Sequence, residues 1–130
     1  MILEIISSMF KLTNKIDNSS KIINTIIGEK NLSEKVAVDV VNSLNASSQP
    51  KVSVLNIMHK IEGTGKVKIY FKNDTTKSVE LTGNGIYGLR QSENILYKDI
   101  NVIGDVLLDT DSDVTKFFLL IECEKIGGYK

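Results

Sequence analysis

The sequence contains very little cysteine, histidine, proline and tryptophan. Its 130 residues include one cysteine, Cys123, one histidine, His59, one proline and no tryptophan. A single cysteine excludes an intramolecular disulfide and a cysteine-based metal cluster. Cys123 lies in the apolar run FFLLIECEKI, which predicts a buried, unreactive thiol. The absence of proline clusters and of tryptophan gives no sign of a proline-rich ligand or of a tryptophan-lined sugar platform.

An excess of either charge is also absent. Sixteen basic residues balance sixteen acidic ones, which gives a formal net charge of +0 at pH 7. No overall field would therefore attract nucleic acid or an anionic membrane, and we expect neither as a partner. A hydrophobic fraction of 42% and a charged fraction of 25% are typical of a folded globular protein.

The beginning of the chain is rich in isoleucine but lacks the features of a signal peptide or a membrane span. Its apolar run is broken by Glu4, Lys11, Lys15 and Asp17. A signal peptide needs an uninterrupted apolar stretch after a basic start, and a spanning helix needs about 20 mostly apolar residues. Both membrane interpretations fail, so we expect a cytoplasmic location.

Apolar residues in this segment recur at spacings of three and four, which is typical of a helical seam. The pattern predicts a coiled coil whose oligomer interface contains Ile2, Ile5, Met9, Leu12, Ile16, Ile23 and Ile26. Isoleucine at both kinds of seam position favours trimers or larger bundles over dimers. Further apolar residues broaden the stripe, so the helix could instead pack on its own domain. Both alternatives stay open at this stage.

A second helix is predicted in NLSEKVAVDVVNSL. Ser33 is a suitable N-cap, and apolar residues follow at intervals of four. The alternation of Val36, Val38 and Val40 also fits a strand, because valine prefers strands. NASSQP at 45–50 has the composition of a turn and marks the predicted boundary between a helical segment, 1–48, and a second domain, 51–130.

The second domain has the pattern of antiparallel strands. KVKIYFK alternates apolar and lysine residues, and NDTT follows as a turn. The closing run VTKFFLLIECEKI is apolar on both faces, which predicts a central strand or one covered by the helices. Short strands separated by turn signals indicate a β-sandwich or jelly roll. The predicted fold class is therefore α+β, with N-terminal helices followed by an antiparallel β-domain.

Three carboxylates in DTDSD resemble the start of a calcium-binding loop. Asp109, Asp111 and Asp113 occupy its first, third and fifth positions. Such a loop requires glycine at position six and a bidentate glutamate at position twelve, where this chain has Val114 and Leu120. We therefore predict no metal site.

The glycine-rich stretch LTGNGIYGLRQ matches neither phosphate-binding pattern, and no Lys-Ser/Thr pair follows it. The glycines are better explained by a turn and a bulge. Tyr87 and Arg90 could form a contact patch there, while His59 has no catalytic partner suggested by spacing. The sequence predicts no catalytic residue, no cofactor and no enzyme activity.

A structural or assembly function is favoured, with a small ligand- or carbohydrate-binding β-sandwich module as the alternative. The helical segment 2–26, the SSQP joint and the β-domain from KVSVLNIMHK to FFLLIECEKI give a layout that resembles small bacteriophage virion proteins of the head-fibre, collar or tail-accessory type. The resemblance concerns the layout and carries no site residue. It implies a homo-oligomeric, trimer-leaning virion component without a cofactor, assembled in the host cytoplasm with other virion proteins.

Overall fold

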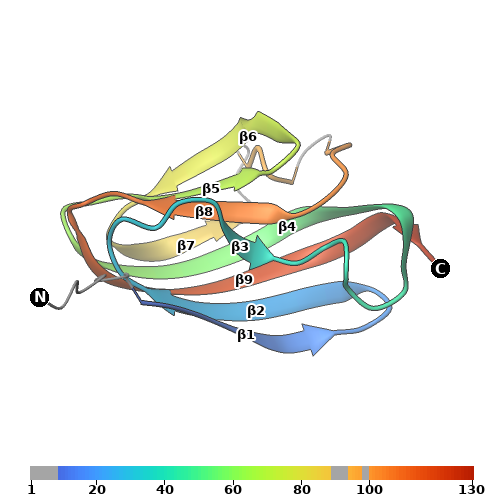
Figure 1. The fold of residues 1–130 in the computed structure, drawn as a ribbon, viewed down its shortest axis with the longest axis horizontal. Coiled ribbons are helices and arrows are strands. Elements are labelled where there is room, and N and C mark those ends of the chain that lie inside the picture. The colour runs from blue at the N-terminus through green and yellow to red at the C-terminus, as the bar shows by residue number, and fades with distance from the viewer. Residues whose placement is uncertain (1–8, 89–93, 98–99) are drawn as a thin grey trace, which may run out of the picture.

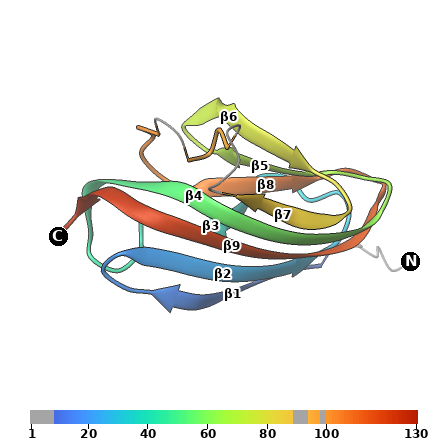
Figure 2. The same cartoon turned by 180° about the vertical axis from the view of Figure 1, so that it is seen from behind.

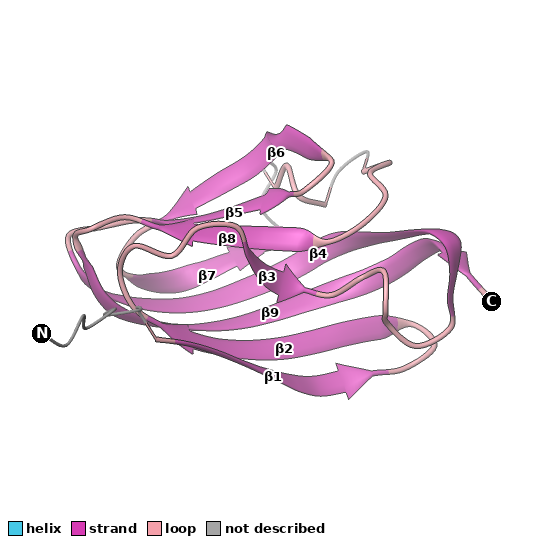
Figure 3. Cartoon of the chain, in the orientation of Figure 1, coloured by secondary structure: helices cyan, strands magenta, loops and turns pink. Residues whose placement is uncertain are grey.

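Nine β-strands form two facing antiparallel sheets in the residues that the structure, a computed structural model, describes: 9–88, 94–97 and 100–130 (Figure 1). The view from behind shows the same two layers (Figure 2). Figure 3 shows strands and loops and no helix in this described part of the chain. Likewise, none of these residues belongs to a helix long and apolar enough to cross a membrane.

The larger sheet has five strands in the order β1-β2-β9-β4-β7. Its strands are β1 (Phe10–Asp17), β2 (Lys21–Gly28), β4 (Ala46–Gly63), β7 (Asn84–Gly88) and β9 (Val114–Tyr129). The smaller sheet has four strands in the order β3-β8-β5-β6. Its strands are β3 (Lys35–Val38), β5 (Val67–Phe71), β6 (Asp74–Leu81) and β8 (Val106–Thr110).

The predicted N-terminal helix is wrong where the structure describes it, because residues 10–28 form the hairpin β1–β2. In β2 the buried residues Ile22, Asn24 and Ile26 alternate with less buried ones, which is the period of a strand. The side chain of Asn18 accepts hydrogen bonds from the backbone N–H groups of Ser20 and Lys21, at 2.9 and 3.0 Å. These bonds close the turn between β1 and β2, which lies between Ile16 and Ile23 of the predicted seam. The coiled coil and the α+β class are therefore wrong, and the described fold is all-β.

The second predicted helix is also wrong. Residues 35–38 form β3, a strand that pairs with β8, so the strand alternative is correct, although the register shifts between Val36 and Val38 and they do not share a face. Val38 is fully buried whereas Val36 is exposed. The strand β4 starts at Ala46 and runs through the predicted boundary at 48–51, so strands from both sides of that boundary share both sheets.

Strands occur where alternation predicted them in the later part of the chain. KVKIYFK contains β5, whose Val67, Ile69 and Phe71 are fully buried between the sheets. The closing run forms β9, which lies between β2 and β4 at the centre of the larger sheet. Its inward residues Leu119 and Ile121 are completely buried and help to fill the core. Because β9 is central, its outward side chains lie in the middle of the larger sheet.

Candidate functional site: the outer face of the larger sheet

The outward side of the five-stranded sheet carries an unusual number of apolar side chains. Cross-strand pairing places Ile27 opposite Phe118, Leu120 opposite Met58, Met58 opposite Ile86, and Ile16 opposite Ile23. We call this set the apolar band; it consists of Ile16, Ile23, Ile27, Met58, Ile86, Phe118 and Leu120. The solvent-facing side of an antiparallel sheet is normally polar. The band is therefore a candidate interaction surface.

The band is substantially open to solvent. Ile86 is 61% exposed and Met58 45% exposed, while Ile27 and Ile16 are 38% and 39% exposed. Ile86 and Ile16 lie on the edge strands β7 and β1, whereas Met58 and Ile27 lie on the inner strands β4 and β2. Members of the band therefore occur from one edge of the sheet to the other. Polar side chains interrupt the band, since Thr25 lies opposite Leu120, Lys60 opposite Phe118 and Glu122 opposite Ile23, yet the band gathers seven large apolar side chains on one face of the sheet.

At one end of the band the surface is hollowed. A hollow of about 490 Å³ lies where β2 and β4 end and where β7 and β9 begin. Its lining consists of Met9, Ile27, Gly28, Lys60, Glu62, Asn84, Lys116, Phe117 and Phe118. Gly28 packs closely here, since a β-carbon would lie 2.7 Å from the ring of Phe117 and the ring would have to shift. The hollow thus combines an apolar floor with charged side chains around it.

Charges of both signs border the band. Lys116 and Glu62 form an exposed ion pair at 3.5 Å beside the hollow. Farther along the sheet, Lys21 and Glu122 form a shorter pair at 3.0 Å, and Asn56 donates a hydrogen bond of 3.2 Å to the same carboxylate. The hydrogen bond from Lys21 lowers the pKa of Glu122 against the opposing effect of burial. We call these lysines and glutamates the rim.

The residues predicted to form an oligomer interface are divided between the two sides of the sheet. Ile16 and Ile23 belong to the apolar band, and Met9 lies in the wall of the hollow. Ile26 is completely buried between the sheets, and Leu12 packs partly buried against the core. Ile2 and Ile5 lie outside the described residues. The division follows from the two-residue period of the hairpin, which replaces the single stripe of a helix.

The predicted contact patch of Tyr87 and Arg90 is described only in part. Tyr87 packs against the core, and its hydroxyl accepts a hydrogen bond of 2.9 Å from the backbone N–H of Ile95. Arg90 lies outside the described residues. Nearby, the ring Nδ1 of His59 lies 3.0 Å from the carbonyl oxygen of Gly83, and His59 is buried. The His59 contact links β4 to the residue that precedes β7, and the Tyr87 contact links β7 to the segment 94–97.

The aspartates of DTDSD bind the protein's own backbone and side chains. Asp109 accepts hydrogen bonds from the hydroxyl of Tyr70 at 2.9 Å and from the N–H of Glu34 at 2.7 Å. Asp111 accepts from the N–H groups of Lys66 and Asp113. Burial and the neighbouring Asp109 raise the pKa of Tyr70 to about 12. Within the described ranges, no three His, Cys, Asp or Glu side chains form a group that could hold a metal ion.

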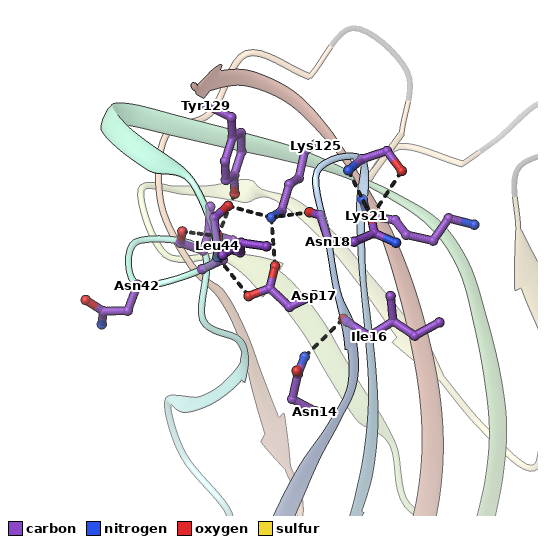
Figure 4. Close-up of polar contacts among 12 residues, drawn as sticks. Asn14, Ile16, Asp17, Asn18, Lys21, Asn42, Leu44, Lys125 and Tyr129 are labelled. Atoms are coloured by element: carbon purple, nitrogen blue, oxygen red, sulfur yellow. Dashed lines mark hydrogen bonds and ion pairs between the residues drawn. The ribbon is translucent and has the colours of Figure 1, made fainter.

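A buried lysine forms a polar cluster that sequence analysis missed (Figure 4). The side chain of Lys125 is 1% exposed, and its ammonium contacts Asp17 Oδ1 at 2.7 Å. It also donates to the carbonyl oxygens of Asn18 at 2.6 Å and Leu44 at 2.7 Å. Asp17 in turn accepts a bond of 2.8 Å from the N–H of Leu44. We call these four residues the lysine cluster.

The lysine cluster is suited to structural linkage and not to catalysis. Its ammonium has three N–H donors, and Asp17, Asn18 and Leu44 take all three. The ring of Tyr129 adds a cation–π contact, with its centroid 4.7 Å away. An ammonium with every donor in use and almost no exposure cannot act as a nucleophile. Because the partners come from the β1–β2 turn and the loop before β4, the cluster holds both against β9.

The one cysteine is equally inaccessible. Cys123 is fully buried between the sheets, and burial raises the pKa of its thiol. Its thiolate is therefore disfavoured, as is nucleophilic chemistry at this position. Comparison with family models, with curated proteins and with solved structures gives no match.

Proposed function

We propose that this protein is a non-enzymatic, self-associating structural protein whose copies meet through the apolar band. The observation that carries the proposal is that β9 is apolar on both of its faces. Its inward residues fill the core, whereas Phe118 and Leu120 point outward in the middle of the larger sheet. Such side chains gain free energy when a second surface removes them from water, at roughly 25 cal/mol per Å² of apolar area.

The charge pattern favours a second copy of the chain as the partner. The rim has both lysines and glutamates, and the formal net charge of the chain is +0. In a two-fold contact the same surface lies on both sides, so a lysine of one copy can approach a glutamate of the other. Two antiparallel sheets also pack well face to face, about 10 Å apart.

The proposal differs from the expectation of a trimeric virion component. The preference for a trimer came from isoleucines at helical seam positions, and residues 10–28 form strands. The resemblance to bacteriophage proteins relied on a helical segment joined to a β-domain, so it loses the helical half of its basis. The class of assembly protein is retained here because the apolar band supports it independently.

Sedimentation equilibrium over a wide concentration range tests the proposal. The double variant Met58→Lys, Ile86→Lys places two charges in the band at positions that are already 45% and 61% exposed, so the fold should tolerate them. We expect association to weaken at least 10-fold. The control is Val41→Lys, at a loop position 53% exposed and outside the band, which should associate like the wild type. A wild type that stays monomeric at millimolar concentration contradicts the proposal.

The size of the hollow supports a second candidate function, binding of a small ligand. A volume of about 490 Å³ falls within the range of small-molecule sites, and Phe118 supplies aromatic surface in a lining that also contains Asn84. A carbohydrate-binding module would use such a combination. Titration with mono- and disaccharides, followed by NMR shifts of residues lining the hollow, tests this function; shifts that the variant Phe118→Ala abolishes would support it.

A further inference from the structure

A second hollow, which we call the small hollow, lies on the outer face of the smaller sheet. Since Ile69 and Phe71 face the core, Tyr70 between them faces outward. The pairing of β3, β8 and β5 places Val36, Leu107 and Tyr70 in one row across these three neighbouring strands. Leu107 and Tyr70 are buried and form an apolar, partly aromatic floor. The small hollow has a volume of about 220 Å³, and its lining consists of Glu34, Val36, Tyr70, Lys72, Thr75 and Leu107.

Charges of opposite sign stand at the two ends of this row. The strands β3 and β5 both pair antiparallel with β8, so they run in the same direction. Glu34 comes two residues before Val36, and Lys72 comes two residues after Tyr70. By the rise and spacing of strands, the two charged positions are about 16 Å apart, with the row between them. Within the described ranges, neither charged group takes part in an ion pair or a side-chain hydrogen bond.

The fold fixes the position of Glu34. Its N–H donates a hydrogen bond of 2.7 Å to Asp109 Oδ1, which also accepts the hydroxyl of Tyr70 at 2.9 Å. The backbone of Glu34 has a φ of 53°, a left-handed value that costs free energy in a residue other than glycine. After burial and Asp109, the carboxylate of Glu34 also contributes to the raised pKa of Tyr70, so it lies near that side chain. One aspartate oxygen thus ties the strained residue to the floor.

We propose that the small hollow binds a zwitterion of dipeptide size, with the ligand's ammonium at Glu34 and its carboxylate at Lys72. Such a ligand has one charge at each end and matches both unpaired groups at once. The ring of Tyr70 has the ammonium of Lys68 5.3 Å from its centroid, so the carboxylate of Glu34 is the better site for the ligand's cation. The apolar floor then contacts the small side chains of the ligand.

The dimensions of the small hollow set the length of the ligand. A free α-amino acid carries both charges on one carbon and would reach only one end of the row. Each further residue adds about 3.5 Å of extended chain. The volume of about 220 Å³ equals that of about seven water molecules in the liquid, so long peptides would not fit inside. A dipeptide satisfies both limits.

This inference is separate from the proposed contact between copies. The apolar band lies on the larger sheet, whereas the row of Val36, Leu107 and Tyr70 lies on the smaller one. None of the residues that line the small hollow belongs to the band or to its rim. Ligand binding can therefore fail while association holds, and association can fail while ligand binding holds.

NMR titration of the full-length chain with alanyl-alanine tests the inference. We expect saturable shifts at the backbone amides of Glu34 and Val36. Glu34→Gln and Lys72→Met should each weaken binding about 10-fold, the usual cost of losing a hydrogen bond to a charged group. The controls are Glu80→Gln and Lys66→Met, whose exposed ion pair of 3.2 Å lies outside the lining, and they should bind like the wild type. Absence of saturable shifts in the wild type, or equal losses in the controls, overturns the inference.

Blocked ligands assign each end of the zwitterion. Acetylation removes the ammonium of alanyl-alanine and amidation removes its carboxylate, and each should weaken binding to the wild type about 10-fold. In Glu34→Gln, acetylation should cause little further loss, because the partner of the ammonium is gone. Amidation should likewise cause little further loss in Lys72→Met. A full second loss in either combination overturns the inference.

Discussion

Lys125 and Asp17 are 108 residues apart in the chain, yet their ammonium and carboxylate groups lie 2.7 Å apart at the end of the larger sheet. The lysine is buried and the aspartate is 24% exposed. The pair joins the end of β1 to β9, the last strand of the fold. It therefore connects the N-terminal hairpin to the C-terminal part of the protein by a charge-assisted contact in addition to the β2–β9 ladder.

Lys125→Met should destabilise the protein by about 1–3 kcal/mol, because the carboxylate and the two carbonyls lose their donor. Urea unfolding measures the change. The matched control is Lys116→Met, whose ion pair with Glu62 is 3.5 Å long and exposed on both sides. That control should lose no more than about 1 kcal/mol. Equal losses for both variants would contradict the structural role of the lysine cluster.

Gly28→Ala should destabilise the fold by about 1–3 kcal/mol through overpacking. Its β-carbon would lie 2.7 Å from two ring carbons of Phe117 and 3.0 Å from Leu32. Gly127→Ala is the control, because the nearest atom there would be Lys51 Cδ at 3.8 Å, an ordinary contact. Thermal unfolding of both variants compares them. A neutral Gly28→Ala would show that Phe117 can move away from the wall of the hollow.

The carboxylate of Glu122 should make stability depend on acid pH. The hydrogen bond from Lys21 lowers its pKa below the ordinary value of 4.5. A group whose pKa is lower in the folded state contributes stability above its unfolded pKa and loses that contribution as the pH falls through the folded value. Glu122→Gln should therefore flatten the decline in unfolding free energy below about pH 4.5. Glu124→Gln, exposed on the same strand, is the control, and an identical flattening there would contradict the assignment.

The hydroxyl of Tyr70 should ionise later than an ordinary tyrosine. Burial and Asp109 raise its pKa from 10.0 to about 12, so its stabilising effect is present below pH 10 and is lost as the pH rises through about 12. Tyr70→Phe should remove the part of the tyrosinate absorbance that appears near pH 12. It should also cost about 1 kcal/mol in urea unfolding at neutral pH, the usual value of one hydrogen bond. Loss of absorbance near pH 10 instead, the ordinary value for tyrosine, would contradict the contact with Asp109.

The sequence alone determined the features that depend on neighbouring residues. Alternation in KVKIYFK was enough to predict β5, because a strand with one buried side has a period of two. FFLLIECEKI is apolar on both sides, which predicted a central strand or one covered by the helices, and β9 is central. No helix covers it in the described residues, and its outward side chains Phe118 and Leu120 belong to the apolar band.

Only the tertiary structure decided the state of the N-terminal segment. Apolar residues at spacings of three and four also occur in two strands joined by a turn. Whether such a segment forms a helix or a hairpin depends on the elements that it packs against. The partner of β2 is β9, whose residues pair with it from Lys21 opposite Glu124 to Gly28 opposite Phe117, about a hundred positions along the chain. Burial of Ile22 and Ile26 against that distant strand stabilises the extended backbone, and local propensity is too weak to oppose it. The lysine cluster depends on the same long-range pairing, since no local pattern relates Asp17 to Lys125.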